Sequence, residues 1–268
     1  MAIFVTELQY TKMIFHYHNT PIHYHKQGTG PVIVMLHGFL ESSTMWQKIA
    51  AVLSKKNTVL MVDLPGFGQS GVPNKTLTME AMATIVCEVL AFENFKSATL
   101  LGHSMGGYVA LAFGELFPKK LDKLILLNSS PTPDSASRKE NRDRALTIID
   151  KNKDAFITMA IGNLFNAEEK SKHTLAIKGL KNEALHISAN GVTAAIKAMR
   201  DRKDRRTLLK NIPCEKHIIA GALDLIIPIQ DIVRVSKQTN TTLHSIESGH
   251  MSWLTNGPEV IALLQGIV

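Results

Sequence analysis

Short apolar runs alternate with helix-like stretches through most of the first 130 residues. The runs at 32–36, 58–62, 98–101 and 124–127 are almost wholly apolar, and helical patterns follow at about 44–53, 79–92 and 107–117. Continuous apolar runs are typical of strands buried on both faces, as in a parallel sheet whose strands are joined by helices. The pattern predicts the α/β class, with a mostly parallel sheet covered by helices on both faces.

A hairpin is expected before this alternation begins. Residues 13–18 and 22–26 read as two strands joined around Asn19-Thr20-Pro21. Four histidines occupy alternate positions on these strands: His16, His18, His23 and His25. A zinc site is conceivable there, but no cysteine or carboxylate joins the histidines. The pattern therefore favours an exposed, partly hydrogen-bonded face, and no metal is expected.

The alternation stops at residues 128–133, where two prolines and three hydroxyl residues mark an exit from the core. Helical patterns then continue at 144–150, 155–164, 167–180 and 191–199, and strand character returns at His217. We therefore predict a first core part at 1–130, a helical cap at 131–209 and a second core part at 210–268. Open α/β sheets bind ligands at the carboxyl ends of their strands. The cap is expected to lie there and to line a pocket, although each apolar candidate could instead pack the cap's own core: Phe156, Met159, Leu164 and Phe165.

Composition limits the class of protein. A length of 268 residues with 45% hydrophobic content suits one α/β domain with an insertion. Apolar runs are interrupted well short of the roughly 20 residues needed to cross a bilayer, so no membrane span is expected. Met1–Glu7 lacks a basic flank and a cleavage pattern, which argues against a secretory signal. Cys87 falls within an apolar helical stretch and Cys214 at the start of a predicted strand, so we expect buried, reduced thiols and a cytoplasmic location.

The excess positive charge lies in the expected cap. Residues 138–210 hold 17 Lys or Arg and 9 Asp or Glu. This excess of positive charge is larger than the net charge of +7 for the whole chain. The basic clusters at 138–144 and 200–206 contain interleaved acids, which favours solvated helix faces with i,i+4 ion pairs. The alternative is a basic surface that attracts an anionic substrate or an acidic carrier. Nucleic acid is not expected, because no aromatic platform or known reader motif accompanies the charge.

The stretch Gly102-His103-Ser104-Met105-Gly106 carries the clearest chemistry. It lies between an apolar strand and a helical segment, and it has the Gly-x-Ser-x-Gly pattern of a nucleophile elbow. A serine in such a sharp turn crowds its neighbours, so small residues are needed two positions to either side. The following helix would point its first amides at the reacting carbonyl. The alternative is that Ser104 is an ordinary helix N-cap.

A serine nucleophile needs a histidine to take its proton and an acid to orient that histidine. In α/β-hydrolases the order along the chain is Ser, then Asp or Glu, then His. Asp224 follows the apolar run 217–220, and His250 follows the strand predicted at 242–246. We predict Ser104 as the nucleophile, His250 as the acid-base and Asp224 as the orienting carboxylate. The competitors are Asp231, inside the next predicted helix, and His244, within the predicted strand.

At this point the chain resembles the α/β-hydrolase superfamily, in its carboxylesterase-like branch, over nearly its whole length. Besides the elbow, the resemblance rests on His37-Gly38-Phe39 after one apolar strand and on residues 63–70, DLPGFGQS, after the next. The resemblance implies a sheet of about eight strands. It also implies an oxyanion hole formed by the backbone N–H groups of Phe39 and Met105. His37, His103 and Asp63 are expected to have structural roles.

The sequence thus predicts a cofactor-free serine hydrolase that cleaves carboxylic esters through an acyl-enzyme on Ser104. Its expected partner is a small-molecule ester, and the basic cap adds an anionic or carrier-bound ester as the alternative. Several alternatives stay open: a thioester, lactone or C–C bond hydrolase, a lyase, a cofactor-free haloperoxidase, or a non-catalytic ligand-binding protein of the same fold. The sequence predicts neither the acyl specificity nor the oligomeric state.

Overall fold

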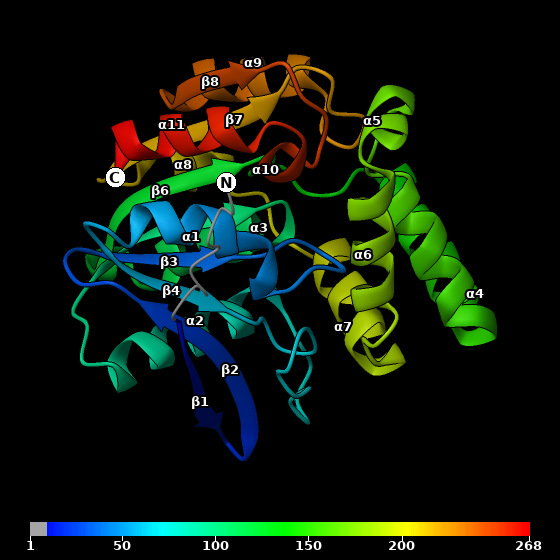
Figure 1. Cartoon of the computed structure of the whole chain (residues 1–268), viewed down its shortest axis with the longest axis horizontal. Coiled ribbons are helices and arrows are strands. Elements are labelled where there is room, and N and C mark those ends of the chain that lie inside the picture. Colours follow the sequence, from blue (N-terminus) through cyan, green and yellow to red (C-terminus); the bar gives the residue numbers. More distant parts are fainter. Residues whose placement is uncertain (1–9) are drawn as a thin grey trace, which may run out of the picture.

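A computed structural model describes residues 10–268, so the expectation about Met1–Glu7 lies outside the described residues. Eight strands form one sheet in the order β1-β2-β4-β3-β5-β6-β7-β8 (Figure 1). Strands β3 to β8 run parallel, whereas β1 and β2 are antiparallel to their neighbours. The predicted fold class is confirmed. The strands are β1 (Thr11–Tyr17), β2 (Thr20–Gln27), β3 (Val32–Leu36), β4 (Thr58–Val62), β5 (Ala98–His103), β6 (Leu121–Leu127), β7 (Glu215–Gly221) and β8 (Thr242–Ile246).

The alternating sides of each strand feed two separate hydrophobic cores. In β3, Ile33 and Met35 face the core that is covered by α1 and α11, while Val34 and Leu36 face the core that is covered mainly by α2, α3, α8 and α9. This explains why the strands are apolar on both faces. The helices that cover the sheet are α1 (Gln47–Leu53), α2 (Met79–Phe92), α3 (Met105–Leu116), α8 (Arg206–Asn211), α9 (Ile229–Thr239) and α11 (Gly257–Ile267); shorter elements are η1 (Ser43–Trp46), η2 (Pro118–Lys120) and α10 (Ser252–Thr255).

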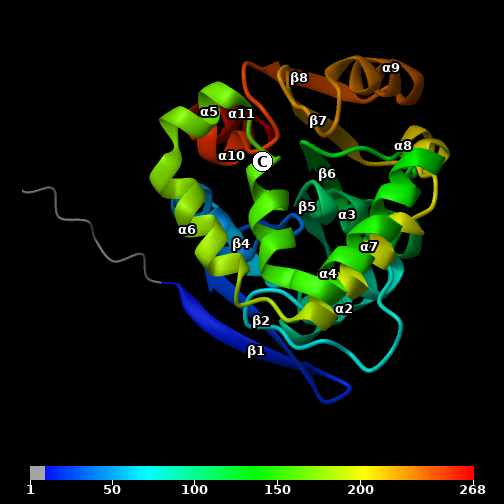
Figure 2. The same cartoon turned by 90° about the vertical axis from the view of Figure 1, so that its right-hand side faces the viewer.

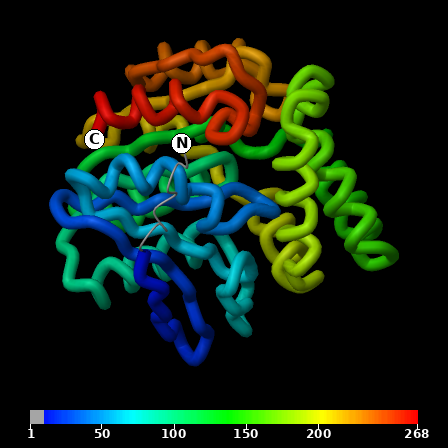
Figure 3. The backbone as a smooth tube through the Cα atoms, in the orientation of Figure 1, coloured from blue at the N-terminus to red at the C-terminus, as the bar shows by residue number. Residues whose placement is uncertain are grey.

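A second group of helices lies between β6 and β7 in the chain: α4 (Ala136–Gly162), α5 (Ala167–Lys172), α6 (Thr174–Ala184) and α7 (Ala189–Arg200). We call these four helices the helical region. They gather at one end of the sheet, and Figure 2 shows them from their outer side. The smooth trace in Figure 3 shows the helical region, in green to yellow, as one continuous stretch of chain at that end of the molecule. The division at residues 130 and 209 into core and cap stays a prediction.

Helix α4 begins earlier than the pattern predicted. The Ser135 side chain accepts from the Arg138 N–H, which caps the helix at Ala136, eight residues before the predicted start. The helix is kinked at Asn152, where φ is −157° and ψ is 87°. Although α4 is long, it is rich in charge. No helix in the part of the chain that the structure describes has both the length and the apolar character needed to cross a membrane.

The N-terminal hairpin has a tighter turn than expected. His18 and Asn19 both have positive φ, 43° and 67°, as a two-residue turn of type I′ requires. Thr20 and Pro21 therefore belong to β2. His16, His23 and His25 share one face of the hairpin, while His18 lies in the turn. Among residues 10–268, no group of three or more ligating side chains is arranged to hold a metal ion.

Candidate active site

Ser104 lies in a strained turn between β5 and α3. Its φ of 48° and ψ of −111° fall in a region that costs on the order of 1–3 kcal/mol. The turn is held by the Ser104 N–H, which donates to Leu127 O at 3.0 Å, and by Ser129 Oγ, which donates to Ser104 O at 2.7 Å. A Cβ on Gly106 would lie 2.2 Å from Leu36 O, so the elbow needs glycine there. This packing presents the Ser104 hydroxyl at the carboxyl end of the sheet.

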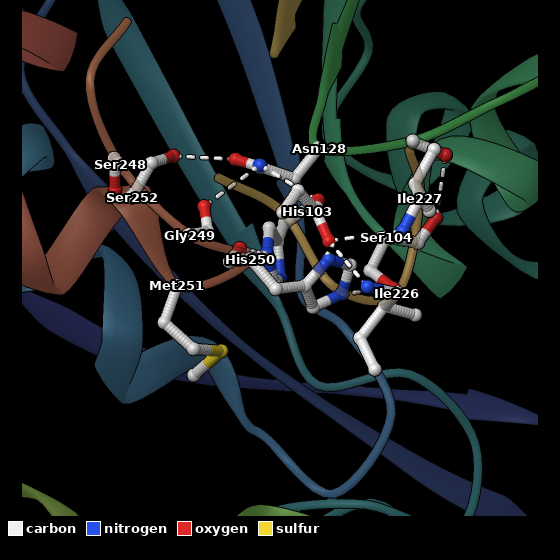
Figure 4. Close-up of polar contacts among 12 residues, drawn as sticks. His103, Ser104, Asn128, Ile226, Ile227, Ser248, Gly249, His250, Met251 and Ser252 are labelled. Carbon is white, nitrogen blue, oxygen red and sulfur yellow. Dashed lines mark hydrogen bonds and ion pairs between the residues drawn. The ribbon is translucent and has the colours of Figure 1, made fainter. Parts of the chain in front are cut away.

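The structure brings the three predicted site residues together, as Figure 4 shows for His250 and Ser104. His250 Nε2 lies 3.0 Å from Ser104 Oγ, and His250 Nδ1 lies 2.8 Å from Asp224 Oδ2. Asp224 is 7% exposed and His250 is 2% exposed. Because a carboxylate oxygen accepts, the ring proton belongs on Nδ1, which leaves Nε2 free to accept from the serine. This is the tautomer that a general base needs.

Four hydrogen bonds orient the Asp224 carboxylate. Its Oδ1 accepts from the N–H groups of Ile226 and Ile227, at 2.8 and 2.9 Å, and its Oδ2 accepts from Asn128 Nδ2 as well as from His250. Burial raises the pKa of Asp224, but the interaction with His250 and these donors outweigh burial, so the pKa lies below its usual value. Asp224 is therefore ionised at neutral pH and cannot rotate freely.

Asn128 is a site residue that the sequence analysis missed. It follows β6 with a φ of 45°. Its amide donates to Asp224 Oδ2 at 3.0 Å and to Gly249 O at 3.1 Å, and its oxygen accepts from Ser252 Oγ at 2.5 Å. Asn128 thus connects the loop of Asp224 to the loop of His250, and the dashed lines in Figure 4 mark its contacts. An asparagine directly after an apolar strand was the available signal, because asparagine tolerates positive φ.

The competing residues lie away from Ser104. Asp231 is on α9, where it pairs with Arg234 at 3.0 Å at the surface. His244 is in β8 and lies 3.1 Å from a ring nitrogen of His217. Asp63 accepts from backbone N–H groups, including that of Gln69 in its own glycine-rich turn at 2.9 Å. None of the three reaches the elbow.

Phe39 and Met105, the expected oxyanion donors, both lie beside Ser104. Met105 is the first residue of α3, so its N–H has no partner within the helix. Phe39 lies in the turn formed by residues 38–41, and the next residue, Leu40, has a φ of 64°. Phe39 lines the same cavity as Ser104. Their role in binding an oxyanion stays a prediction.

A cavity of about 350 Å³ opens over Ser104 and His250. Of the four apolar residues predicted to line it, Phe156 and Leu164 do so. Met159 does not, because α4 turns Phe156 and Ala160 toward the cavity and leaves Met159 49% exposed. Phe165 also does not, because it lies past the end of α4 and packs into the core with 1% exposure.

Two arginines of the first basic cluster line the cavity, with Asn141 between them in sequence. Arg138 and Arg142 pair with the two oxygens of Asp134, at 3.2 and 3.1 Å, and Arg202 pairs with the same carboxylate at 2.7 Å. Burial raises the pKa of Asp134, but the three guanidinium groups outweigh burial, so the pKa lies below its usual value. Three cations thus share one anion, and this part of the wall keeps a positive charge.

The second basic cluster contains two buried arginines, which corrects the expectation of a solvated face. Arg202 is 6% exposed and stacks over the Tyr108 ring at 4.1 Å. Arg205 is 2% exposed and pairs with Glu80 and Glu115 at 2.5 and 2.9 Å. Their acidic partners come from elsewhere in the chain, so sequence spacing could not reveal them.

Comparison with known proteins agrees with this geometry. A family model described as the alpha/beta hydrolase fold matches residues 31–256. A pimeloyl-acyl carrier protein methyl ester esterase from Pseudoalteromonas atlantica is 30% identical over 217 residues, which cover 76% of this chain and 80% of that protein. Uncharacterized proteins of Mycobacterium tuberculosis and Mycobacterium bovis are 37% identical over 102 residues, or 38% of this chain. That match spans only 30% of their length.

Solved structures match over almost the whole chain. A thermophilic esterase from Thermogutta terrifontis, solved with malate bound, has a TM-score of 0.88 and 28% identity, and the match covers 96% of this chain and 97% of that one. An enol-lactonase from Burkholderia xenovorans has a TM-score of 0.87 over 95% and 98% of the two chains. At 18% identity the second likeness concerns the fold alone.

Proposed function

This chain belongs to the α/β-hydrolase fold family, and we propose that it is a serine esterase that hydrolyses carboxylic esters through an acyl-enzyme on Ser104. One observation carries the proposal: the hydrogen-bonded series from Ser104 Oγ through the His250 ring to Asp224, with distances of 3.0 and 2.8 Å, beside a cavity. Esterases among the relatives and the solved structures support it.

In the first half of the reaction, Ser104 Oγ attacks the ester carbonyl carbon and gives its proton to His250 Nε2. Asp224 stabilises the imidazolium that forms. The carbonyl oxygen becomes negative and accepts from the N–H groups of Phe39 and Met105. The carbon–oxygen bond to the alcohol then breaks, and the alcohol leaves with the proton from His250.

In the second half, a water molecule takes the place of the alcohol. His250 Nε2 removes one proton from this water as its oxygen attacks the acyl carbon. The tetrahedral intermediate uses the same two N–H donors. When it collapses, Ser104 recovers its proton from His250 and the carboxylic acid is released.

We further propose that residues 131–209 form a cap that shapes the substrate pocket. Residues of α4 and α7, including Phe156 and Met199, supply one wall of the cavity, and the loops after the strands supply the other. A cap in this position excludes water from the reacting groups. The length of the acyl group would then depend mainly on the helical wall.

The positive wall favours an anionic or carrier-bound ester as the substrate. Arg138 and Arg142 line the cavity and share Asp134 with a third arginine, so their charge is only partly neutralised. The Pseudoalteromonas relative is named as an esterase for a methyl ester on acyl carrier protein. An acidic group on the acyl chain or on its carrier would meet this wall.

A panel of p-nitrophenyl esters of graded chain length, with thioester and lactone controls, tests the function. We expect ester turnover in the wild type, together with labelling of Ser104 by a fluorophosphonate. A protein that binds a ligand but shows neither turnover nor labelling would belong to the non-catalytic class. If the thioester or lactone control is turned over faster than the esters, the protein would be assigned to that class of hydrolase.

Salt dependence tests the substrate class separately. For an ester with a free carboxylate, kcat/KM should fall steeply from low to high salt, because screening weakens attraction to the arginines. The value for a neutral ester of the same length should change little. An equal salt response for both esters would remove the argument for an anionic substrate.

A further inference from the structure

Two buried ionisable side chains meet beside the proposed triad, and the mechanism above uses neither of them. Glu41 is 5% exposed and His103 is 1% exposed. Glu41 Oε2 lies 2.8 Å from His103 Nδ1. Buried charges are costly unless they are paired and hydrogen-bonded, so the position of this pair needs an explanation.

The hydrogen-bond partners limit the protonation states that the two groups can adopt. The Glu41 oxygens face two further donors, the Gly38 N–H at 2.6 Å and Trp253 Nε1 at 3.1 Å. His103 Nε2 faces the carbonyl oxygen of His250 at 3.0 Å, and a carbonyl oxygen can only accept. His103 Nε2 must therefore carry a proton. One further proton lies between His103 Nδ1 and Glu41 Oε2. When it is on the nitrogen, His103 is an imidazolium that donates from both ring nitrogens, and Glu41 is a carboxylate that accepts from all three donors.

The charges around the pair act in the same direction. Burial lowers the pKa of His103, but the Glu41 carboxylate outweighs burial, and Asp224 adds to its effect, so the pKa is raised. Burial raises the pKa of Glu41, but His103, with His37 and the Gly38 N–H, lowers it below its usual value. These charges therefore favour the ion pair over the neutral pair.

The pair connects three segments that the proposed mechanism requires. Gly38 precedes Phe39 in the oxyanion loop, and His103 precedes Ser104 in the elbow. The His250 carbonyl, which faces His103 Nε2, belongs to the loop of the base. The ring centroids of His250 and His103 lie 5.2 Å apart. The approach is close: a Cβ on Gly38 would lie 2.3 Å from Glu41 Oε2 and 2.7 Å from His103 Nδ1.

We propose that Glu41 and His103 form a positioning pair that holds the oxyanion loop, the elbow and the base loop in their reactive arrangement. The inference rests on the proposed function, because it assigns the geometry of the same site. If the pair is broken, the His250 ring can shift relative to Ser104 Oγ. A misplacement of about 1 Å in such a site can cost about 100-fold in rate.

The variant Glu41→Gln tests the pair with almost no change of shape. An amide offers one acceptor oxygen to three donors, so at least one of the hydrogen bonds is lost. We expect kcat per titrated active site to fall about 10- to 100-fold, with KM changed less than about threefold. Glu93→Gln is the matched control. Glu93 is another shielded carboxylate, bonded to Tyr24 and Lys26 away from the cavity. This control should leave kcat unchanged.

The pH profile distinguishes positioning from a general loss of stability. In the wild type, kcat should fall on the alkaline side as His103 loses a proton and one hydrogen bond. Glu41 raises the pKa of His103, so its removal should move this alkaline limb to lower pH. A merely structural effect would lower the active fraction and leave the limb in place, as we expect for Glu93→Gln.

Nitrogen NMR of the histidine rings tests the ion pair without any substrate. One ring should stay doubly protonated above the pH at which an ordinary histidine loses its proton. Its signal should disappear in His103→Gln and change to a neutral form in Glu41→Gln. A neutral His103 ring in the wild type would overturn the inference, as would an unchanged kcat per titrated site in Glu41→Gln. Failure of the proposed function is distinguishable, since the wild type would then show no turnover and no labelling of Ser104.

Discussion

The two walls of the cavity are built in different ways. The sheet wall carries Ser104, His103 and His250, which lie at or just past the ends of strands and are held by hydrogen bonds to other segments. The helical wall carries Arg138 and Phe156 on α4, a helix with a kink and a mostly exposed, charged surface. On the proposed function, this difference separates the chemistry of the site from the choice of substrate. Changes on the sheet wall should alter kcat, and changes on the helical wall should alter which ester is accepted.

The substitution Ser104→Ala should have the largest effect of all. It removes the nucleophile, and kcat should fall about a millionfold, as in comparable triads. Steady-state hydrolysis of a p-nitrophenyl ester measures this loss. The control is Ser130→Ala, which changes another buried serine, one that bonds to Thr132. This variant should keep its activity. Activity near the wild-type level in Ser104→Ala would remove the nucleophile assignment.

The substitution Asp224→Asn should cost about four decades in kcat. The amide can donate to His250 Nδ1, which stabilises the tautomer that cannot accept from Ser104. The comparison variant is Asp231→Asn, which changes the competing acid on the surface of α9. It should have no effect. A larger loss of kcat in Asp231→Asn than in Asp224→Asn would assign the role of orienting acid to Asp231.

On the helical wall, Asp134→Asn should lower stability, because three arginines lose their shared anion. We expect a loss of about 2 kcal/mol, less than for a fully buried pair, since Arg138 and Arg142 keep contact with water. For a chain of this size, that corresponds to a fall in Tm of about 4 to 8 °C. Asp143→Asn, in the exposed pair with Arg200, should change Tm much less.

The pH dependence of that stability has a definite sign. The folded pKa of Asp134 lies below its unfolded value, so its contribution is complete above the unfolded pKa. The contribution is lost as the pH falls through the lower, folded value. Thermal unfolding curves of the wild type and Asp134→Asn should therefore converge in acid. A constant difference at all pH values would contradict the ionised state of Asp134.

The variants Arg138→Gln and Arg142→Gln should have the smallest effect and the most selective one. Each should lower kcat/KM about tenfold for an ester with a free carboxylate, which corresponds to about 1.4 kcal/mol of transition-state stabilisation. The kcat/KM for a neutral ester should not change. Arg144→Gln, on the same helix but 72% exposed at its side chain, is the control. Equal losses for acidic and neutral esters would indicate a packing defect and no role in specificity.

The sequence predicted the sheet wall well because its signals are local. Apolar runs predict buried strands, and the elbow motif follows from the crowding around Ser104. Asp224 and His250 could be placed because each follows a predicted strand. Glu41 could not be found in this way. Its importance depends on His103, 62 residues away, and on Trp253, 212 residues away.

The helical wall was predicted only in outline. Its helical character and excess charge were evident, but the start of α4 and the direction of its side chains were not. Met159 and Phe156 are equally apolar, and only the packed structure shows that one faces solvent. Arg202 and Arg205 look like surface residues in the sequence, yet partners from distant segments bury them.

Rapid mixing with p-nitrophenyl acetate, followed by peptide mapping, tests the central claim most directly. The account predicts an initial burst of about one p-nitrophenol per chain and an acetyl group on the peptide that contains Ser104. Release of p-nitrophenol without a covalent intermediate, or acetylation confined to another residue, would contradict it.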